Sequence, residues 1–176
     1  MNSKLKAQNS KLVFIALGSN LGSSREIILG AMECLQKFSE EKILQSSLWK
    51  SSPVNCPPDS PDFINAVVGL FLRENETPES LLEKLQMLEK DFGRKKKTIL
   101  NEPRPLDLDL IAFGKEIRAF GKLILPHPRA LERKFVLQPL SEIAPDFIFP
   151  GLKKTVLELL ALLKTGEVLT RLSAVS

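Results

Sequence analysis

The chain has 176 residues, of which 43% are hydrophobic and 26% are charged, and these values exclude a disordered or fibrous protein. A formal net charge of +4 and a pI near 9.1 weakly favour anionic ligands such as nucleotides, phosphorylated metabolites or nucleic acid. The two cysteines have neither metal-ligand spacing nor a disulfide pattern, which is typical of free thiols in a reducing compartment. No apolar run is long enough for a secretory signal or a membrane span, so we expect a cytoplasmic protein with no membrane partner.

The first half of the chain alternates strand-like and helix-like patterns. "KLVFIAL" is a short apolar run that ends at a glycine, which predicts a buried strand. Ser23 and Glu26 have the spacing of a capping box and predict that a helix begins there. In chain order, we predict a strand at residues 11–17, a helix at 23–38, a strand at 43–51 and a proline-rich loop at 52–62.

The second half continues this alternation and then becomes rich in proline. Thr77 followed by Pro78 is a helix-start signal, and Gly93 ends the same helix. "GKE" reads as a hairpin turn. In chain order, we predict a strand at 63–73, a helix at 77–92, a basic loop at 94–105, a strand at 106–113, a hairpin strand ending near Leu125, and helices at 129–133 and 155–164.

The predicted order is β-α-β-β-α-β-β followed by helices. Its first six elements match the ferredoxin-like arrangement, an α+β fold with an antiparallel sheet and both main helices on one face. We therefore expect helices packed around the sheet, as in an α/β/α sandwich, with the face opposite the two main helices free for a site. The predicted domain covers residues 11–165, with tails at 1–10 and 166–176.

The segment "NEPRPLDLDL" places Asp107 and Asp109 between leucines at strict alternation. Residues two apart in a strand project from the same face, about 6–7 Å apart. Two carboxylates this close repel each other unless a positive charge lies between them. Many cations flank the pair in the sequence: Arg94, Lys95, Lys96, Lys97, Arg104, Lys122, His127, Arg129 and Arg133. This composition suits a Mg²⁺-bound polyphosphate, although a solvent-facing strand edge is the alternative.

Three further patterns carry weaker signals. "GSNLG" lacks the spacing of a Walker loop, so a plain strand-to-helix turn is its alternative reading. His127, the only histidine, could donate a hydrogen bond to a phosphate oxygen or could be structural. Phe63 and Asn65 share a strand face and could bind a flat heterocycle, but a core phenylalanine and a turn asparagine would give the same pattern.

Three longer motifs carry a family resemblance: "FIALGSNLG", "PRPLDLDLIAFG" and "PHPRALERKFVLQPLSEIAP". Together they resemble the signatures of the 6-hydroxymethyl-7,8-dihydropterin pyrophosphokinase family of folate biosynthesis, over about residues 11–150. The resemblance implies a ferredoxin-like fold. It also implies transfer of the β,γ-diphosphate of ATP to the pterin's hydroxymethyl oxygen, with release of AMP.

The resemblance also implies roles for individual residues. Asp107 and Asp109 match residues that bind two Mg²⁺ ions, and Arg94 and Arg104 match basic residues in or beside a mobile catalytic loop. The implied pterin-binding residues are Ser52, Pro53, Asn55, Phe63, Asn65, Asp107 and Phe135. The implied nucleotide-binding residues are Gln86, Glu89, Lys96, Leu110, Lys122, Leu123, Ile124, His127 and Arg133.

Some positions depart from the family pattern. Asn101 stands where a tryptophan is frequent, and Lys96 and Lys122 stand where arginine is common. Phe63 and Pro128 replace frequent tyrosines. A lysine offers a point charge in place of a bidentate fork. We expect these departures to affect nucleotide affinity and loop closure more than the reaction.

Two other functions fit parts of the sequence. A basic ferredoxin-like domain can bind single-stranded RNA, but the chain has no tyrosine and its paired aspartates would repel phosphate. An ordinary ATP:alcohol kinase would release ADP. We therefore expect small-molecule partners, ATP and the pterin, no nucleic acid, and association or fusion with other folate-pathway enzymes as an open option.

Overall fold

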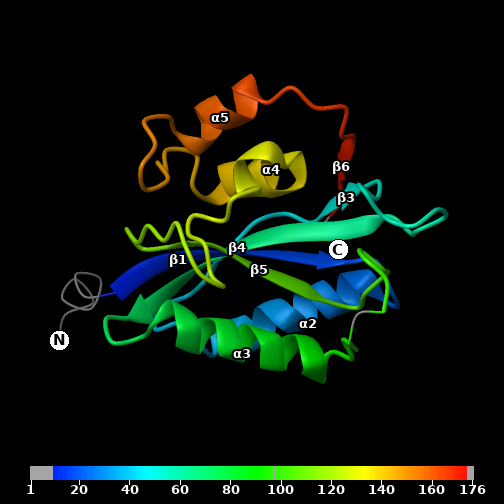
Figure 1. The fold of residues 1–176 in the computed structure, drawn as a ribbon, viewed down its shortest axis with the longest axis horizontal. Helices are drawn as coiled ribbons and strands as arrows, with labels where there is room; N and C mark the ends of the chain where they lie inside the picture. Colours follow the sequence, from blue (N-terminus) through cyan, green and yellow to red (C-terminus); the bar gives the residue numbers. More distant parts are fainter. Residues whose placement is uncertain (1–9, 97, 174–176) are drawn as a thin grey trace.

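The computed structural model describes residues 10–96 and 98–173 (Figure 1). Its elements in chain order are β1 (Ser10–Ser19), α2 (Ser24–Gln36), β2 (Leu44–Gln45), β3 (Trp49–Ser51), β4 (Phe63–Arg73), α3 (Pro78–Asp91), β5 (Asp107–Phe113), a 3₁₀ helix (Ala130–Glu132), α4 (Lys134–Ile143), α5 (Val156–Leu162) and β6 (Leu169–Arg171). Of the tail predicted at 1–10, all but Ser10 lies outside the described residues. No helix in the described ranges is both long and apolar enough to span a bilayer.

The six strands form one sheet in which every pairing is antiparallel. Their order is β5-β1-β4-β3-β6, and β2 also pairs with β4. If β2 and β3 are taken as one interrupted strand, the chain up to β5 follows the βαββαβ order of ferredoxin-like folds. The α+β prediction is confirmed.

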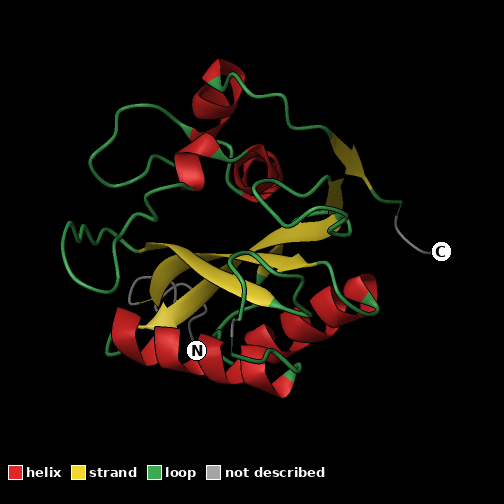
Figure 2. Cartoon of the chain, turned by 45° about the vertical axis from the view of Figure 1, so that its right-hand side comes forward, coloured by secondary structure: helices red, strands yellow, loops and turns green. Residues whose placement is uncertain are grey.

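Helices cover both faces of the sheet (Figures 1 and 2). Along β1, Val13, Ile15 and Leu17 enter the core that contains residues of α2 and α3. Phe14 and Ala16 point the other way, into a second core with residues of α4 and α5. Both faces of β1 are therefore apolar, as expected for a strand covered on both sides. The expectation of a free second face is therefore wrong where α4 and α5 cover it, and this face remains open only where these helices do not reach.

The helix α4 is the main element that the sequence patterns missed. Pro139 lies inside it, and proline inside a helix removes a backbone donor and clashes with the preceding turn. The helix still forms because Val136, Leu137 and Leu140 are buried against the sheet. Apolar burial here outweighs the unfavourable intrinsic propensity.

Several predicted boundaries differ from the structure. The strand expected at 43–51 is interrupted around Ser46, whose hydroxyl accepts a hydrogen bond from the Val67 N–H at 2.9 Å. The prediction of a hairpin strand after the "GKE" turn is wrong, because Arg118 forms a bridge with Leu125 and does not pair with β5. The segment from 166, expected to be a tail, contains β6, which pairs with β3.

The helix starts also separate correct from incorrect expectations. Thr77 caps α3 by accepting from the Ser80 N–H at 3.2 Å, and Thr155 and Glu158 form a reciprocal capping box at α5. Ser23 occupies the N-cap position of α2, but its side chain makes no capping bond in the described part of the chain. The capping box predicted for Ser23 and Glu26 is therefore wrong.

This contrast gives a matched test of stability. Thr77→Ala removes a formed capping bond and should lower the free energy of unfolding by about 1 kcal/mol. Ser23→Ala removes a hydroxyl that makes no such bond and should change the free energy of unfolding by only a few tenths of a kcal/mol. Urea unfolding followed by circular dichroism measures both, and equal losses would contradict this account of the two helix starts.

Candidate active site

The paired aspartates lie on a strand, β5, as the alternation predicted, and this strand is at the edge of the sheet. Leu106, Leu108 and Leu110 are buried in the core on the α2–α3 side, and the two carboxylates project from the opposite face. On β1, Asp107 lies opposite Gly18 and Asp109 lies opposite Ala16. These small partners leave open space over the sheet beside the carboxylates.

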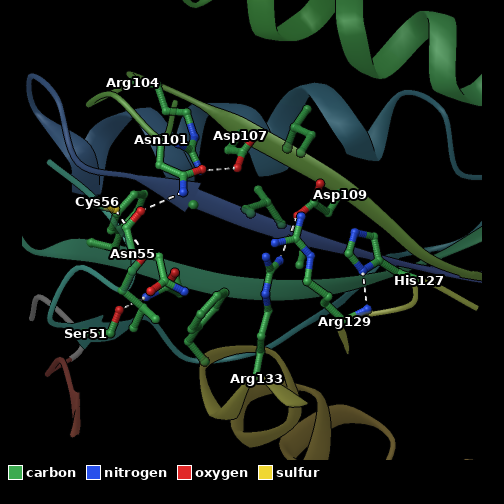
Figure 3. A pocket seen from close by; sticks show the side chains of 18 of the residues that line it. Ser51, Asn55, Cys56, Asn101, Arg104, Asp107, Asp109, His127, Arg129 and Arg133 are labelled. Carbon is green, nitrogen blue, oxygen red and sulfur yellow. Dashed lines mark hydrogen bonds and ion pairs between the residues drawn. The ribbon is translucent and has the colours of Figure 1, made fainter. Parts of the chain in front are cut away.

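A cavity of about 500 Å³ occupies this space (Figure 3). Its volume lies within the range of small-molecule sites. Most of the residues predicted to act in a site line it: Ser52, Asn55, Phe63, Asn65, Gln86, Glu89, Arg94, Arg104, Asp107, Asp109, His127, Arg133 and Phe135. The fold thus brings together side chains from β4, β5, α3, α4 and the intervening loops.

Arginines from separate segments surround the two carboxylates. Asp107 accepts from Arg94 Nη1 at its Oδ1 and from Arg104 Nη2 at its Oδ2, both at 2.7 Å. Arg133, the residue before α4, lies with its Nη1 3.6 Å from Asp109 Oδ2. These guanidinium groups place positive charge beside both carboxylates.

Glu89 connects α3 to this cluster. Its carboxylate accepts from Arg94, and its Oε1 accepts from the Leu108 N–H at 2.7 Å. Burial raises the pKa of Glu89, while the hydrogen bond from Leu108 and the charge of Arg94 oppose that rise. Glu89 therefore fixes the start of the aspartate strand and orients one of its arginines.

The environment shifts the pKa of Asp109 and His127 in opposite directions. Burial raises the pKa of Asp109, and the Asp107 charge adds to the rise. Burial lowers the pKa of His127, although Asp109 partly opposes this. His127 Nδ1 accepts from the Arg129 N–H at 3.2 Å, so the neutral ring carries its proton on Nε2. The imidazole at neutral pH can therefore donate a hydrogen bond from Nε2.

Two aromatic rings of the cavity wall lie beside these arginines. Arg104 Cζ lies 5.4 Å from the centroid of the Phe63 ring, and Arg133 Cζ lies 5.4 Å from that of Phe135. Asn65 is 4% exposed and its Nδ2 donates to Ser51 Oγ at 2.8 Å. Aromatic faces beside an oriented amide suit a flat heterocycle.

Asn20 of the "GSNLG" turn joins the ends of the two long loops. Its Oδ1 accepts from the Arg104 N–H at 2.9 Å, its own N–H donates to Arg104 O at 3.2 Å, and its Nδ2 donates to Pro61 O at 3.3 Å. The side chain is 2% exposed. Asn20 is therefore a buried junction between the basic loop and the proline-rich loop.

The two loops also touch at their outer parts. Asn101 Nδ2 donates to Asn55 O at 2.7 Å. Both residues have positive φ, 56° and 53° respectively, a conformation that asparagine tolerates better than most residues. At position 101 the asparagine thus gives the loop a backbone conformation and a link that a tryptophan would not favour.

Some predicted residues do not line the cavity within the described part of the chain. The side chain of Leu110 is 3% exposed in the opposite core, so only its backbone is available to a ligand. Leu123 packs against the same core. Pro53, Lys96, Lys122 and Ile124 also lie off the cavity, and the flanking Lys97 lies outside the described residues.

Other lining residues had not been selected from the sequence. They include Ser51, Val54, Cys56, Glu132 and Glu167. Ser51 ends a strand at the proline-rich loop and could have been inferred from its neighbours. Glu167 had no local signal, because it reaches the site only through the pairing of β6.

The fold and this cavity define an α+β protein with a cavity whose charged and aromatic lining suits an anionic ligand and a flat one. Residues 14–145, more than half of the chain, match the family model "7,8-dihydro-6-hydroxymethylpterin-pyrophosphokinase (HPPK)". The chain belongs to this family, whose members are pyrophosphokinases of folate synthesis, and it is an enzyme of the diphosphokinase class.

Individual relatives agree with this assignment. A 2-amino-4-hydroxy-6-hydroxymethyldihydropteridine pyrophosphokinase of Pseudomonas aeruginosa is 38% identical over 139 residues, which cover 78% of this chain and 83% of the relative. The folic acid synthesis protein fol1 of Pneumocystis carinii is 41% identical over 152 residues, 85% of this chain but only 20% of that protein. The same domain thus also occurs as one part of longer folate-synthesis proteins.

Solved structures support the fold. The wild-type HPPK-DHPS of Plasmodium falciparum with pteroate aligns with a TM-score of 0.66 at 13% identity, covering 86% of this chain and 44% of that one.

The Asn20 junction gives a test of how the loops are held. Asn20→Ala leaves the Arg104 N–H and the Pro61 carbonyl without this partner and should lower the free energy of unfolding by about 1–3 kcal/mol. Limited proteolysis should also cut residues 52–62 and 94–105 faster. Asn101→Gly, which keeps the positive φ and removes only a more exposed amide, should stay within about 0.5 kcal/mol of wild type. Unchanged proteolysis of Asn20→Ala would contradict the junction.

The raised pKa of Asp109 predicts a pH-dependent stability difference. The folded state binds the Asp109 proton more tightly than the unfolded state does. Ionisation of this group therefore lowers stability as the pH rises above the pKa of an unperturbed aspartate. Asp109→Asn should therefore be more stable than wild type at pH 7, and the difference should vanish below about pH 3.9. Urea midpoints across this range measure it, with the exposed Asp146→Asn as a charge-matched control that should follow wild type. A less stable Asp109→Asn at pH 7 would refute the assigned burial effect.

Proposed function

We propose that the chain transfers the diphosphate of ATP to the hydroxymethyl oxygen of 6-hydroxymethyl-7,8-dihydropterin and releases AMP. The main support is one juxtaposition: a single cavity holds the carboxylate pair, its arginines, two aromatic rings and a buried amide. The charged groups suit a polyphosphate, and the rings with the amide suit a pterin.

For the pterin, we propose that Phe63 and Phe135 stack on its faces while Asn65 bonds to its polar edge. Ser51 orients the Asn65 amide, which is a condition for a selective hydrogen bond. Ser52 and Asn55 line the same cavity from the proline-rich loop. Pro53 and Asp107 complete the set of expected pterin contacts.

For the nucleotide, we propose that Arg94, Arg104 and Arg133 contact phosphate oxygens. Guanidinium groups give charge-assisted, bidentate bonds to phosphate. His127 can donate from Nε2, and Gln86 and Glu89 lie on the α3 side of the cavity. Contacts from Lys96, Leu110, Lys122, Leu123 and Ile124 stay predictions, which require backbone groups or loop movement.

The donor set fits magnesium. Among the described residues there is no group of three or more metal-ligating side chains, so the protein would supply Asp107 and Asp109 only. Mg²⁺ commonly takes one or two carboxylates and completes its shell with water and substrate phosphates. We propose that the two aspartates hold the two expected Mg²⁺ ions, which would neutralise phosphate charge and make the attacking hydroxyl easier to deprotonate.

The expected step is attack of the hydroxymethyl oxygen on the β-phosphorus. A new O–P bond forms at that phosphorus, the bridge to the α-phosphate breaks, and AMP leaves with the bridging oxygen. The hydroxyl proton is released to water, and no side chain is assigned as its general base. The work of the chain is therefore positioning and charge neutralisation.

The arginines must change partners during this cycle. Each oxygen of Asp107 accepts from one arginine in the structure. A cation held by Asp107 would compete with both guanidinium groups, which would then be available to phosphate oxygens. We propose that this exchange couples closure of the basic loop to nucleotide binding.

A cytoplasmic location belongs to the same proposal. The two cysteines, Cys34 and Cys56, are both free, which suits a reducing compartment.

Removal of either carboxylate tests the proposal. Asp107→Ala and Asp109→Ala should each reduce pterin-dependent AMP formation by at least about a thousandfold, a loss of about 4 kcal/mol, while circular dichroism shows an intact fold. Asp91→Ala removes an exposed carboxylate at the end of α3 and should retain activity. Normal turnover by either cavity variant would overturn the assigned role.

The nucleotide product separates two kinds of kinase. We expect AMP and pterin diphosphate in equal amounts from wild-type protein, measured by chromatography with the pterin present. ADP with a pterin monophosphate would show an ordinary kinase and contradict the proposed attack at the β-phosphorus.

A further inference from the structure

The first turn of α4 has no cap of its own. Arg133 occupies the N-cap position without a capping side-chain bond in the described residues, and the first turn contains no acidic residue. The first N–H groups of a helix lack partners within the helix and need acceptors from elsewhere. Glu167 provides one, because its Oε2 accepts from the Phe135 N–H at 3.3 Å. A carboxylate at this end also interacts favourably with the helix dipole.

The strand β6 holds Glu167 in place. Two residues after Glu167, Leu169 pairs with Ser51 of β3, and the Leu172 N–H donates to Leu48 O at 2.9 Å. The Glu167 N–H donates to Thr165 Oγ1 at 3.2 Å. Figure 1 shows β6 next to β3, on the side of the sheet that α4 covers. The cap is therefore anchored to the strand that carries Ser51, another residue of the cavity wall.

A second carboxylate ties the far end of α4 to the same edge. Glu142 Oε2 accepts from the Ser47 N–H at 2.7 Å, and Glu142 Oε1 lies 3.5 Å from Arg171 Nε of β6. The helix is thus held at both ends against the segment formed by β3 and β6. Only the Glu167 end faces the cavity, where Glu167 and Phe135 both line the wall.

We infer that Glu167 is a positioning residue for pterin binding: it holds the first turn of α4, and with it the Phe135 ring, at the cavity wall. The identity of the ligand, a pterin, rests on the proposed function. The hydrogen bond from the Phe135 N–H to Glu167 does not depend on that function. The segment after α5 thereby contributes a residue to the cavity wall, although the sequence predicted none from that segment. Glu167 acts through Phe135 and has no part in the chemical step.

Two substitutions at Glu167 and one matched control test the inference. Glu167→Ala removes the acceptor, and Glu167→Gln keeps an acceptor oxygen but removes the charge. Glu158→Ala removes a carboxylate acceptor from the start of α5, where Glu158 accepts from the Thr155 N–H at 2.8 Å away from the cavity. All three are compared with wild type for stability, for steady-state kinetics with each substrate, and for amide hydrogen exchange.

We expect Glu167→Ala to raise KM for the pterin about fivefold, the factor that corresponds to loss of one helix cap, with KM for ATP changed less than twofold. Exchange at the Phe135 amide should become faster. Glu167→Gln should recover most of both effects, and Glu158→Ala should leave both KM values at the wild-type level.

Two outcomes would overturn the inference. One is unchanged exchange of the Phe135 amide in Glu167→Ala. The other is an equal rise of both KM values together with a stability loss like that of Glu158→Ala, which would show a general structural role. Exchange needs no turnover, so an absence of pterin-dependent activity in wild type would refute the proposed function and leave the test of the Phe135 contact intact.

Discussion

Repulsion between two carboxylates on one face of an edge strand is the constraint on which the site depends. Side chains two apart in a strand cannot separate, so Asp107 and Asp109 need cations from outside β5. The structure supplies them from three places: Arg94 after α3, Arg104 at the end of the basic loop and Arg133 before α4. Each arginine ties another element to the strand. The geometry of the cavity is therefore largely a consequence of this charge compensation.

The same arrangement separates fixed from movable parts. Asn20, itself buried, holds Arg104 and Pro61 by hydrogen bonds, whereas the contact between Asn101 and Asn55 lies at the exposed outer part of the loops. Local opening is easiest where backbone hydrogen bonds are few and exposed. Movement over a bound ligand would then be concentrated in the middle of each loop, while the ends that carry the arginines stay in register with the sheet.

The features that the sequence predicted are those set by local periodicity. The alternation around Asp107 gave the correct strand and face, and Thr77 with Pro78 gave the correct helix start. The helix α4 was missed because Pro139 lowers local propensity while burial of Val136 and Leu140, a tertiary effect, decides the outcome. The strand β6 was missed because three residues carry too little periodicity.

The site predictions divide along the same physical line. Residues on strands, such as Phe63 and Asn65, could be placed because the side-chain period in a strand is two. Residues in the segment that ends near Leu125 could not, since its expected pairing with β5 is replaced by the bridge between Arg118 and Leu125. Neither a local pattern nor a motif could predict Glu167 as a site residue. Its position is set by the pairing of β3 with β6, which lie more than a hundred residues apart.

The helix α4 combines two roles that explain why it tolerates an internal proline. Its buried side packs with Phe14, Val67 and Ile111 of the sheet and closes one part of that face. Its first turn, next to Arg133, presents Phe135 at the part left open. A helix anchored by its core along one side and by carboxylates at both ends does not depend on intrinsic propensity for its position. Such anchoring suits a ring that must keep its place while the neighbouring arginines exchange one anionic partner for another.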